Sequence, residues 1–257
     1  MKKLLWATFG VALISTAFAE DNKENVAVVD LGLESGILWT TCNLGATNPW
    51  NCGNYYAWGE TETKKEYSWN TYKYCDDWYI KNHIAYSNSF TKYCYDSNFG
   101  KDGFTDTLTI LEPTDDVATV VLGSDYSMPT AADWKELTEQ CRWEWTSNYN
   151  GHNVNGYIIY KAKSDKDKGS KSYYDEYYTP PVPYTLSDTH IFLPAAGGCW
   201  GAICDSVSGP NCNYWAATHG NRSPDYANYC HFFRHLLMPV DVEFRYKGYP
   251  IRAVRRK

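Results

Sequence analysis

The chain has 257 residues, of which 44% are hydrophobic, 17% aromatic and 21% charged, and its formal net charge is −6. It contains 23 Tyr and 11 Trp but only 15 Leu. Because Leu is the staple of helical cores, this balance argues against a helical bundle or coiled coil, and the many large side chains exclude a disordered chain. The excess of acidic residues argues against binding to nucleic acid, whose phosphates need clustered Lys and Arg. We therefore expect a turn-rich fold of short strands packed by aromatic side chains.

The N-terminus has the pattern of a secretory signal peptide. Two lysines precede the apolar run 4–14, and Ala17-Phe18-Ala19 matches a cleavage site of the A-x-A type. This run is shorter than the roughly 20 residues that span a bilayer, and no later run reaches that length. We predict a signal peptide at 1–19 and one mature domain at 20–257, exported to the periplasm, the cell surface or the medium. Removing the signal peptide takes away two of the 24 basic residues and none of the 30 acidic ones, which brings the net charge to about −8.

All nine cysteines follow the predicted cleavage site. Export permits disulfides, so we expect most cysteines to pair, and the odd number leaves at least one thiol unpaired or intermolecular. No C-x-x-C motif occurs, which removes the main signal for a zinc ribbon or a thioredoxin-type site. We predict Cys75–Cys94, because similar YKYC and TKYC stretches flank one short loop, and Cys212–Cys230. A disulfide that closes a loop of this length adds about 3 kcal/mol to the free energy of unfolding in the chain-entropy model.

The first half of the mature chain predicts strands separated by turns and then long loops. Residues 26–33 are expected to form a strand, which a turn at 34–36 connects to a second strand at 37–42. A short aromatic strand is expected at 55–59. Residues 60–110 are polar and aromatic without clean periodicity, which indicates loops packed by aromatic side chains.

Two helices are expected in the middle of the chain. Thr114 is predicted to cap a short helix over 115–122, whose first turn carries two acidic residues. Thr130 is predicted to cap a helix over 131–141. Apolar residues recur in that second helix at the spacing of one buried face, at Trp134, Leu137 and Cys141.

The second half of the chain alternates strand signals with one long insertion. Strands are expected at 142–146 and 154–160, and a charged tract followed by a Tyr/Pro tract makes 161–188 a protruding loop. Five further short strands are expected at 190–198, 214–218, 228–235, 242–246 and 250–256. The chain is therefore predicted to be a single α+β domain with few short helices and many short antiparallel strands joined by long loops.

Ten motifs in a fixed order carry a resemblance to a known family. The chain contains, in order, VDLGLESGILWTTCNLGA, YYAWGET, SWNTYKYC, LTILEPTDDVA, SMPTAADWKEL, CRWEW, VNGYIIY, IFLPAAGG, YWAAT and GYPIRAV. This series resembles the Fibrobacter succinogenes major paralogous domain over about residues 27–256. That family is similar in turn to the C-type-lectin-like superfamily, which includes the formylglycine-generating enzymes. The resemblance implies a C-type-lectin-like fold and assigns no chemistry.

An enzymatic alternative also follows from this resemblance. Formylglycine-generating enzymes hold copper with two cysteines five residues apart, and Cys199 and Cys204 have that spacing. A local disulfide, or two separate bridges, is the competing interpretation of the same pair. His231 and His235 would share a face of a helix, as metal ligands often do, but the aromatic stretch predicts a strand that separates them by about 13 Å. Neither a G-x-S-x-G nor an H-E-x-x-H motif occurs, so we predict no enzyme activity, no cofactor and no metal.

A binding module is the function that we predict. In the resembling superfamily the strands form a platform and loops of the C-terminal half present variable side chains, so we expect recognition of a glycan or a surface protein by a loop at 219–228. This loop follows a strand directly and should be better ordered than 161–188. A structural component of the cell surface or of an adhesin is the third alternative, and the sequence leaves the oligomeric state open. The predicted ligand-binding residues are Trp200, His219, Asn221, Arg222, Asp225 and Tyr226.

Overall fold

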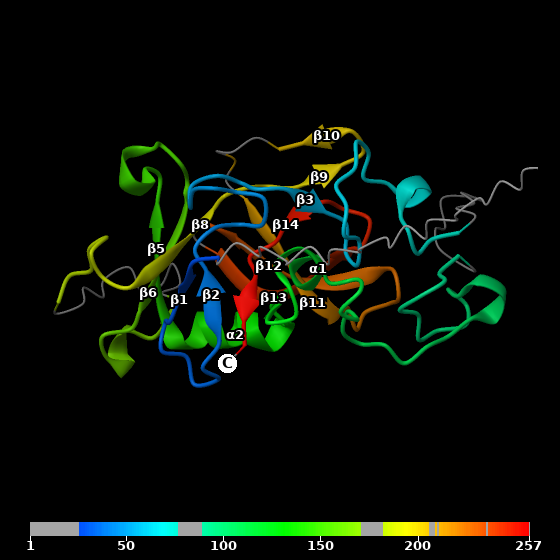
Figure 1. Cartoon of the computed structure of the whole chain (residues 1–257), viewed down its shortest axis with the longest axis horizontal. Helices are drawn as coiled ribbons and strands as arrows, with labels where there is room; N and C mark the ends of the chain where they lie inside the picture. Colours follow the sequence, from blue (N-terminus) through cyan, green and yellow to red (C-terminus); the bar gives the residue numbers. More distant parts are fainter. Residues whose placement is uncertain are drawn as a thin grey trace, which may run out of the picture.

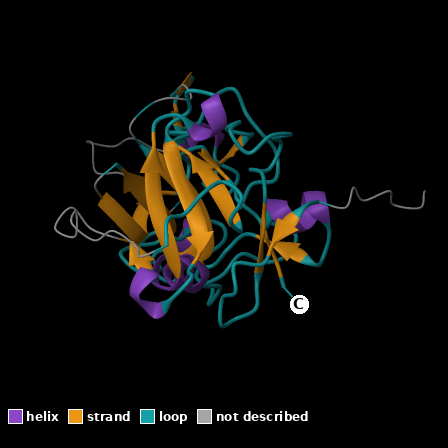
Figure 2. Ribbon diagram, turned by 90° about the vertical axis from the view of Figure 1, so that its left-hand side faces the viewer, coloured by secondary structure: helices purple, strands orange, loops and turns teal. Residues whose placement is uncertain are grey.

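The computed structural model has the α+β architecture with few helices that the sequence predicts. It describes residues 26–76, 89–170, 182–205, 209, 211–234 and 236–256. The predicted signal peptide at 1–19 lies outside the described residues, as does most of the Tyr/Pro tract. Within the described residues the chain forms two α-helices, isolated turns of 3-10 helix and many short strands, most of them antiparallel. Figure 1 shows the strands through the middle of the molecule, and Figure 2 shows the short helices at its periphery.

The strands form three larger sheets and two small ribbons. The sheets have the orders β1-β2-β15-β4, β7-β5-β6-β8 and β11-β12-β13, and the ribbons pair β3 with β14 and β9 with β10. Neighbouring strands are antiparallel except β5 and β7, which are parallel. The strands are β1 (Val28–Val29), β2 (Leu38–Thr40), β3 (Tyr55–Tyr56), β4 (Tyr126–Ser127), β5 (Cys141–Thr146), β6 (Gly156–Lys161), β7 (Gly169–Ser170), β8 (His190–Pro194), β9 (Cys199–Trp200), β10 (Ile203–Cys204), β11 (Cys212–His219), β12 (Tyr226–Phe233), β13 (Leu236–Phe244), β14 (Tyr249–Pro250) and β15 (Val254–Arg255).

Helix α2 (Ala131–Gln140) begins as the sequence predicts. The Thr130 hydroxyl accepts the Asp133 backbone N–H at 3.2 Å, and the Asp133 carboxylate accepts the Thr130 backbone N–H at 2.7 Å. This capping box satisfies two of the N–H groups that the first turn leaves without a partner. The predicted buried face is also present, since Trp134 and Leu137 are both fully buried.

Helix α1 (Val117–Leu122) has a different cap from the predicted Thr114. Asp116 is its N-cap, and the carboxylate accepts the backbone N–H groups of Ala118 and Thr119. The same carboxylate accepts the backbone N–H of Met128, at 2.8 Å to the nearer oxygen. The Asp116 carboxylate is charged and bonds both the first turn of α1 and the backbone after β4, so it is a stronger cap than the Thr114 hydroxyl. The prediction of Thr114 was therefore wrong.

The sheet β11-β12-β13 separates two apolar clusters, because alternate residues of a strand point to opposite faces. On one face Tyr214 of β11 and Phe232 of β12 pack with Trp134 of α2. On the other face Trp215 packs against Tyr229 at 6.2 Å between ring centroids. Aromatic rings therefore fill both sides of this sheet, which explains how a chain poor in Leu builds its core.

In the same way, strands β5, β6 and β8 separate the apolar cluster that contains Trp134 of α2 from a third apolar cluster. Ile159 and Leu193 face the cluster that contains α2. Ile158 and Phe192 face the third cluster, where the Phe192 ring stacks on Tyr149 at 3.9 Å. Sheets and apolar clusters therefore alternate: each of these two sheets has one apolar cluster on either face.

Arg252, just before β15, is a fully buried cation that ties separate strands together. Its guanidinium donates to the carbonyl oxygens of Thr40, Thr41 and Phe192, at 2.8–3.1 Å, and to Asn43 Oδ1 at 2.9 Å. Burial lowers the pKa of Arg252 from its ordinary value. Removing the side chain would take a hydrogen-bond donor from each of these four acceptors, which makes this residue a structural one.

The cysteines correct the predicted disulfides. Cys199 and Cys204 form the one disulfide of the structure, in which all nine cysteines are described, with an S–S distance of 1.98 Å. The expectation that most cysteines pair was therefore wrong, whereas the expectation of at least one unpaired thiol is confirmed. The seven free cysteines are Cys42, Cys52, Cys75, Cys94, Cys141, Cys212 and Cys230.

The strand registers explain why the two predicted pairs are absent. Cys212 lies opposite Phe232, while Cys230 lies opposite Tyr214, so the two thiols are offset by two residues along the β11–β12 pair. Cys75 lies opposite Phe90, and the Cys94 thiol instead donates to the Asp96 carbonyl oxygen at 3.2 Å. A disulfide needs facing Cβ atoms about 4 Å apart, which neither arrangement supplies by register.

Candidate binding site

A groove of about 880 Å³ lies where the turn between β11 and β12 meets the middle of β13. Its walls come from segments far apart in the sequence: a loop at 95, the segment before α1 at 109, the turn itself and β13. This volume is in the range of sites that hold a small ligand, roughly 300–1,000 Å³. The groove is lined by Tyr95, Thr109, Thr218, His219, Gly220, Asn221, Arg222, Asn228, Val240, Asp241 and Val242.

His219, at the end of β11, forms the floor of the groove and is held rigidly. Its side chain is only 6% exposed, with Nδ1 2.7 Å from the Gly220 carbonyl oxygen and Nε2 3.3 Å from Nη1 of Arg245. Nε2 also lies 3.2 Å from the Pro224 carbonyl oxygen, so both ring nitrogens have partners within the protein. Burial, together with the Arg245 charge, lowers the pKa of His219 to about 4. The ring is therefore neutral at pH 7.

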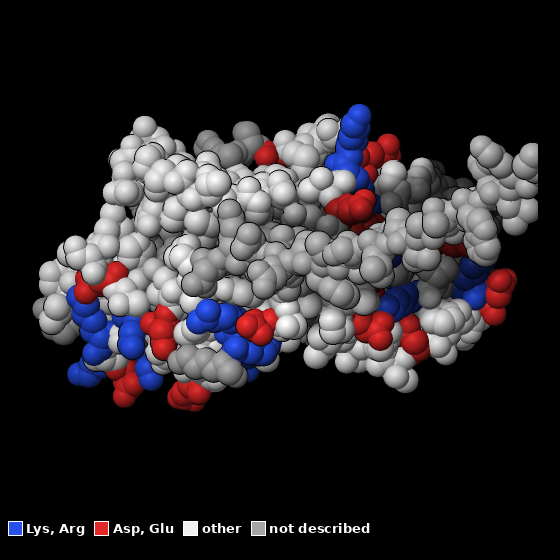
Figure 3. Space-filling model, in the orientation of Figure 1, with Lys and Arg blue, Asp and Glu red and all other residues white. Residues whose placement is uncertain are grey.

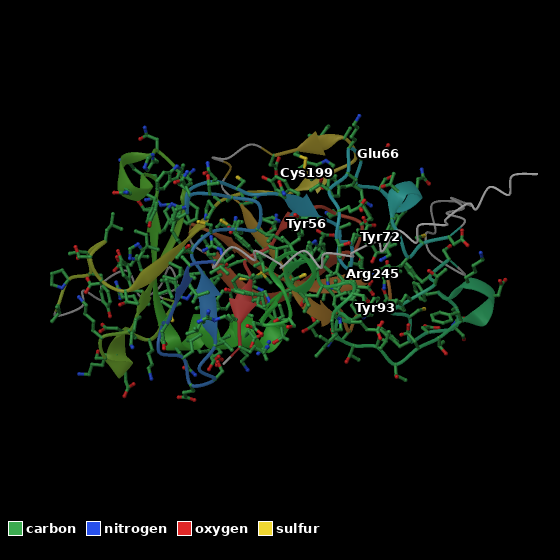
Figure 4. The ribbon with its side chains drawn as sticks, viewed as in Figure 1. Tyr56, Glu66, Tyr72, Tyr93, Cys199 and Arg245 are labelled. Atoms are coloured by element: carbon green, nitrogen blue, oxygen red, sulfur yellow. A yellow bond between two sulfur atoms is a disulfide. The ribbon has the colours of Figure 1, made fainter. Side chains whose placement is uncertain are left out.

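Arg245, directly after β13, supports this floor from inside the core. It is fully buried, and its guanidinium donates to the Tyr93 carbonyl oxygen at 2.8 Å. The guanidinium carbon lies 4.3 Å from the centre of the Phe90 ring and 5.2 Å from that of Tyr72. Carbonyl oxygens and aromatic faces thus stabilise the cation. Figure 4 shows Arg245 between Tyr72 and Tyr93, below the β9–β10 ribbon.

The turn between β11 and β12 is closed by its own backbone. Gly220 N–H donates to the Tyr226 carbonyl oxygen at 3.1 Å, and Tyr226 N–H donates to that of Ser223, also at 3.1 Å. The Asp225 carboxylate, 3% exposed, accepts the Ser223 hydroxyl inside the turn. Gly220 is required here, because a Cβ at this position would lie 2.8 Å from the Tyr226 carbonyl oxygen. The turn therefore presents its exposed side chains on a fixed frame.

Two of those side chains, Asn221 and Arg222, are exposed at the rim of the groove. The Arg222 guanidinium lies 5.3 Å from the centre of the Tyr226 ring, which itself stacks on Phe244 at 4.6 Å. A cation over an aromatic face is held in place with a small energy gain, of about 0.5–1 kcal/mol at exposed sites. Arg222 is thus positioned for a ligand while Tyr226 is engaged inside the protein.

The facing walls add one aromatic ring and a strip of polar and aliphatic groups. Tyr95 is 49% exposed, and its ring meets the edge of His219 at 5.6 Å. On the other wall the Asn228 amide donates to the Asp241 carbonyl oxygen at 3.4 Å, beside the exposed Val240. The groove therefore offers both apolar surface and hydrogen-bonding groups.

The structure brings together only part of the predicted site. His219, Asn221 and Arg222, which belong to the predicted loop at 219–228, line the groove together. Asp225 and Tyr226 belong to the same turn, but Asp225 is buried and the Tyr226 ring is occupied by Phe244 and Arg222.

Trp200 does not line this groove. It belongs to β9, which Figure 1 places at the upper edge of the molecule, whereas the turn between β11 and β12 lies lower and to the right. Tyr95 and Asp241 are site residues that the sequence did not indicate. Tyr95 meets His219 across 124 positions of sequence, and no local pattern predicts such a contact.

A second cavity, of about 640 Å³, lies beside α1 and the start of α2. Two of the charged side chains that line it, Asp116 and Arg256, are already engaged within the protein. The Asp116 carboxylate caps α1, and the Arg256 guanidinium pairs with the Asp133 carboxylate at 2.7 Å. The first groove is therefore the better candidate for a ligand.

No group of three or more His, Cys, Asp or Glu in the described part of the chain is arranged to hold a metal ion. Neither described helix has the length and apolar character needed to cross a bilayer. Figure 3 shows Lys and Arg side chains interspersed with Asp and Glu along one face, without an extended basic patch.

Comparison of the chain with protein-family models, with curated proteins and with solved structures finds no match. The geometry of the groove is therefore the basis for a functional assignment.

Proposed function

We propose that the protein is an exported, non-catalytic binding module that recognises a carbohydrate in the groove between the β11–β12 turn and β13. The observation that carries this proposal is that the half-exposed Tyr95 ring lines the same groove as Asn221 and Arg222, in contact with the buried His219. Sugars offer an apolar C–H face to an aromatic ring and hydroxyl groups to planar amide and guanidinium groups. The groove supplies both kinds of contact within one small-ligand volume.

The state of the ionisable groups in the groove supports binding rather than catalysis. Both ring nitrogens of His219 are engaged, by the Gly220 carbonyl oxygen and by Arg245. The Asp241 carboxylate accepts the Val242 backbone N–H at 2.8 Å and lies 3.4 Å from the Tyr229 hydroxyl. A general acid or base must be within reach of the proton that it moves, and these groups are committed elsewhere.

The sequence supports the cellular part of the proposal. The predicted signal peptide at 1–19 suits an exported module, and so does the resemblance to the Fibrobacter succinogenes major paralogous domain. The C-type-lectin-like superfamily, which that family resembles, presents loops of its C-terminal half from a platform of strands, and the β11–β12 turn that lines the groove also belongs to the C-terminal half of this chain. The bonded sulfurs of Cys199 and Cys204 favour the local disulfide over the copper-oxidase alternative.

The test is a glycan array probed with the mature chain. The wild-type protein is expected to bind at least one glycan, and Arg222→Ala combined with Asn221→Ala should weaken that binding at least tenfold, equivalent to about 1.4 kcal/mol. Arg234→Ala is the matched control, because Arg234 is an exposed arginine in the β12–β13 turn that does not line the groove. Equal binding by the double variant and the wild type, or selective binding to a surface protein with no glycan bound, contradicts the proposal.

A further inference from the structure

The β9–β10 ribbon displays two large apolar side chains that the groove does not use. Trp200 is 45% exposed and Ile203 is 64% exposed. They are direct cross-strand partners, as are Cys199 and Cys204 in the next register position. Because alternate residues point to opposite faces, Trp200 and Ile203 lie side by side on one face, and the disulfide lies on the other. Cys199 is fully buried, so the apolar pair faces outward.

The ribbon is fixed at several points, so the pair cannot turn inward. Tyr67 and Gly201 exchange two backbone hydrogen bonds, at 2.7 and 2.8 Å. Cys199 and Gly248 exchange two more, at 2.7 and 2.9 Å. The disulfide closes the ribbon between its two strands. An exposed apolar pair on a rigid frame binds a ligand without first losing conformational entropy.

Polar groups border this pair on the side of residues 66–68. The antiparallel bridge between Tyr67 and Gly201 puts Ser68 across from Trp200 and Glu66 across from the residue after Gly201. The Ser68 hydroxyl donates to the exposed Glu66 carboxylate at 2.9 Å. Figure 4 shows Glu66 beside the end of the ribbon. A hydroxyl and a carboxylate thus stand at the edge of an aromatic and aliphatic surface.

The size and charge of the surface indicate what covers it. Large side chains have a surface of roughly 150–250 Å² each, so the exposed parts of Trp200 and Ile203 together amount to about 200 Å². This area is much smaller than the ~800 Å² that each partner buries in a stable protein interface. A patch of this size matches one sugar ring. The neighbouring Glu66 and the acidic net charge of the chain disfavour an anionic lipid surface.

We infer that Trp200 and Ile203 form a second carbohydrate contact, which takes the flat C–H face of a pyranose while Glu66 and Ser68 bond its hydroxyl groups. This inference rests on the proposed function for its ligand class but uses none of the groove residues, so either can fail alone. Two separate contacts on one chain make a polysaccharide a tighter ligand than a short oligosaccharide, because the second contact forms within the same complex.

The experiment measures retention of the full mature chain by cellulose, chitin, xylan and mannan. Trp200→Ala and Ile203→Ser are each expected to weaken retention on at least one polymer by tenfold or more. Val120→Ser is the matched control, because Val120 is a half-exposed apolar residue of α1. An unchanged melting temperature for each variant shows that it folds. A second measurement is N-bromosuccinimide oxidation of Trp200 followed by peptide mass spectrometry, which the hexasaccharide of the retained polymer should slow at least fivefold.

Each outcome separates the second contact from the groove. Loss of retention in Arg222→Ala but not in Trp200→Ala, with no protection of Trp200, overturns the second contact and leaves the groove in place. Loss in Trp200→Ala alone overturns the groove and supports the second contact. No retention on any polymer overturns the second contact, while the glycan array decides the groove. Retention on phosphatidylcholine vesicles that depends on Trp200, without binding to any polymer, assigns the ribbon to a membrane and overturns the inference.

Discussion

The contact between His219 and Arg245 makes a quantitative prediction about stability in acid. The folded protein holds the His219 ring neutral, with a pKa of about 4, whereas an unfolded chain has the ordinary value of 6.5. Between these pH values the unfolded state binds a proton that the folded state does not, so the free energy of unfolding decreases as the pH falls. At 1.36 kcal/mol for each pKa unit, the loss is about 3 kcal/mol in total and about 2 kcal/mol between pH 8 and pH 5.

The measurement is urea unfolding of the wild type and of His219→Gln at pH 8 and at pH 5, with a reductant present. Glutamine keeps a donor and an acceptor but does not titrate. The free energy of unfolding of the variant should therefore decrease by about 2 kcal/mol less than that of the wild type between pH 8 and pH 5. Other titrating groups, such as the half-buried His231 with its lowered pKa, are common to both chains and cancel. If both chains lose the same free energy, His219 is not buried against Arg245 and the described floor of the groove is wrong.

Three further outcomes are expected. Arg252→Met should destabilise the fold by about 3 kcal/mol or more in urea unfolding, because it leaves several buried oxygens without a donor, while Arg234→Met at the surface should change it by less than about 0.5 kcal/mol. Alkylation of the denatured, unreduced protein should modify seven thiols by mass spectrometry, and modification of all nine would refute the Cys199–Cys204 disulfide. Deleting 163–172, which removes the edge strand β7, should leave glycan binding within twofold of the wild type, and loss of binding at an unchanged melting temperature would move the site to that segment.

Local signals predicted the parts of the fold that depend on nearby residues. The capping box at Thr130 and the buried face of α2 involve contacts within one helix, and both predictions are confirmed. Strands β5 and β6 also fall within a residue or two of their predicted ranges. Thr114 was a wrong cap because Asp116 gains a distant partner, the Met128 backbone N–H, which no local pattern contains.

Features that depend on register or on distant contacts could not be predicted. The exact offset between β11 and β12 decides whether two cysteines face each other, and a sequence does not disclose it. The loop that carries Asn221 and Arg222 was predicted, but its opposite wall comes from Tyr95 and β13. The expected strand at 242–246 proved to be the end of the longer β13, which contains Pro239 at an outer position of its sheet.

The unpaired cysteines make unfolding of this protein a starting point for thiol–disulfide exchange. Burial raises the pKa of Cys212 and Cys230 well above the ordinary value, and Cys141 is shifted to about 12, so these sulfurs stay protonated and unreactive in the folded state. Unfolding exposes them all at once, in a chain that already holds one disulfide able to exchange. Heating under oxidising conditions should therefore trap scrambled isomers that do not refold, whereas heating with a reductant should be reversible. In an oxidising compartment the lifetime of the protein is then set by how rarely it opens, not by the equilibrium between folded and unfolded forms.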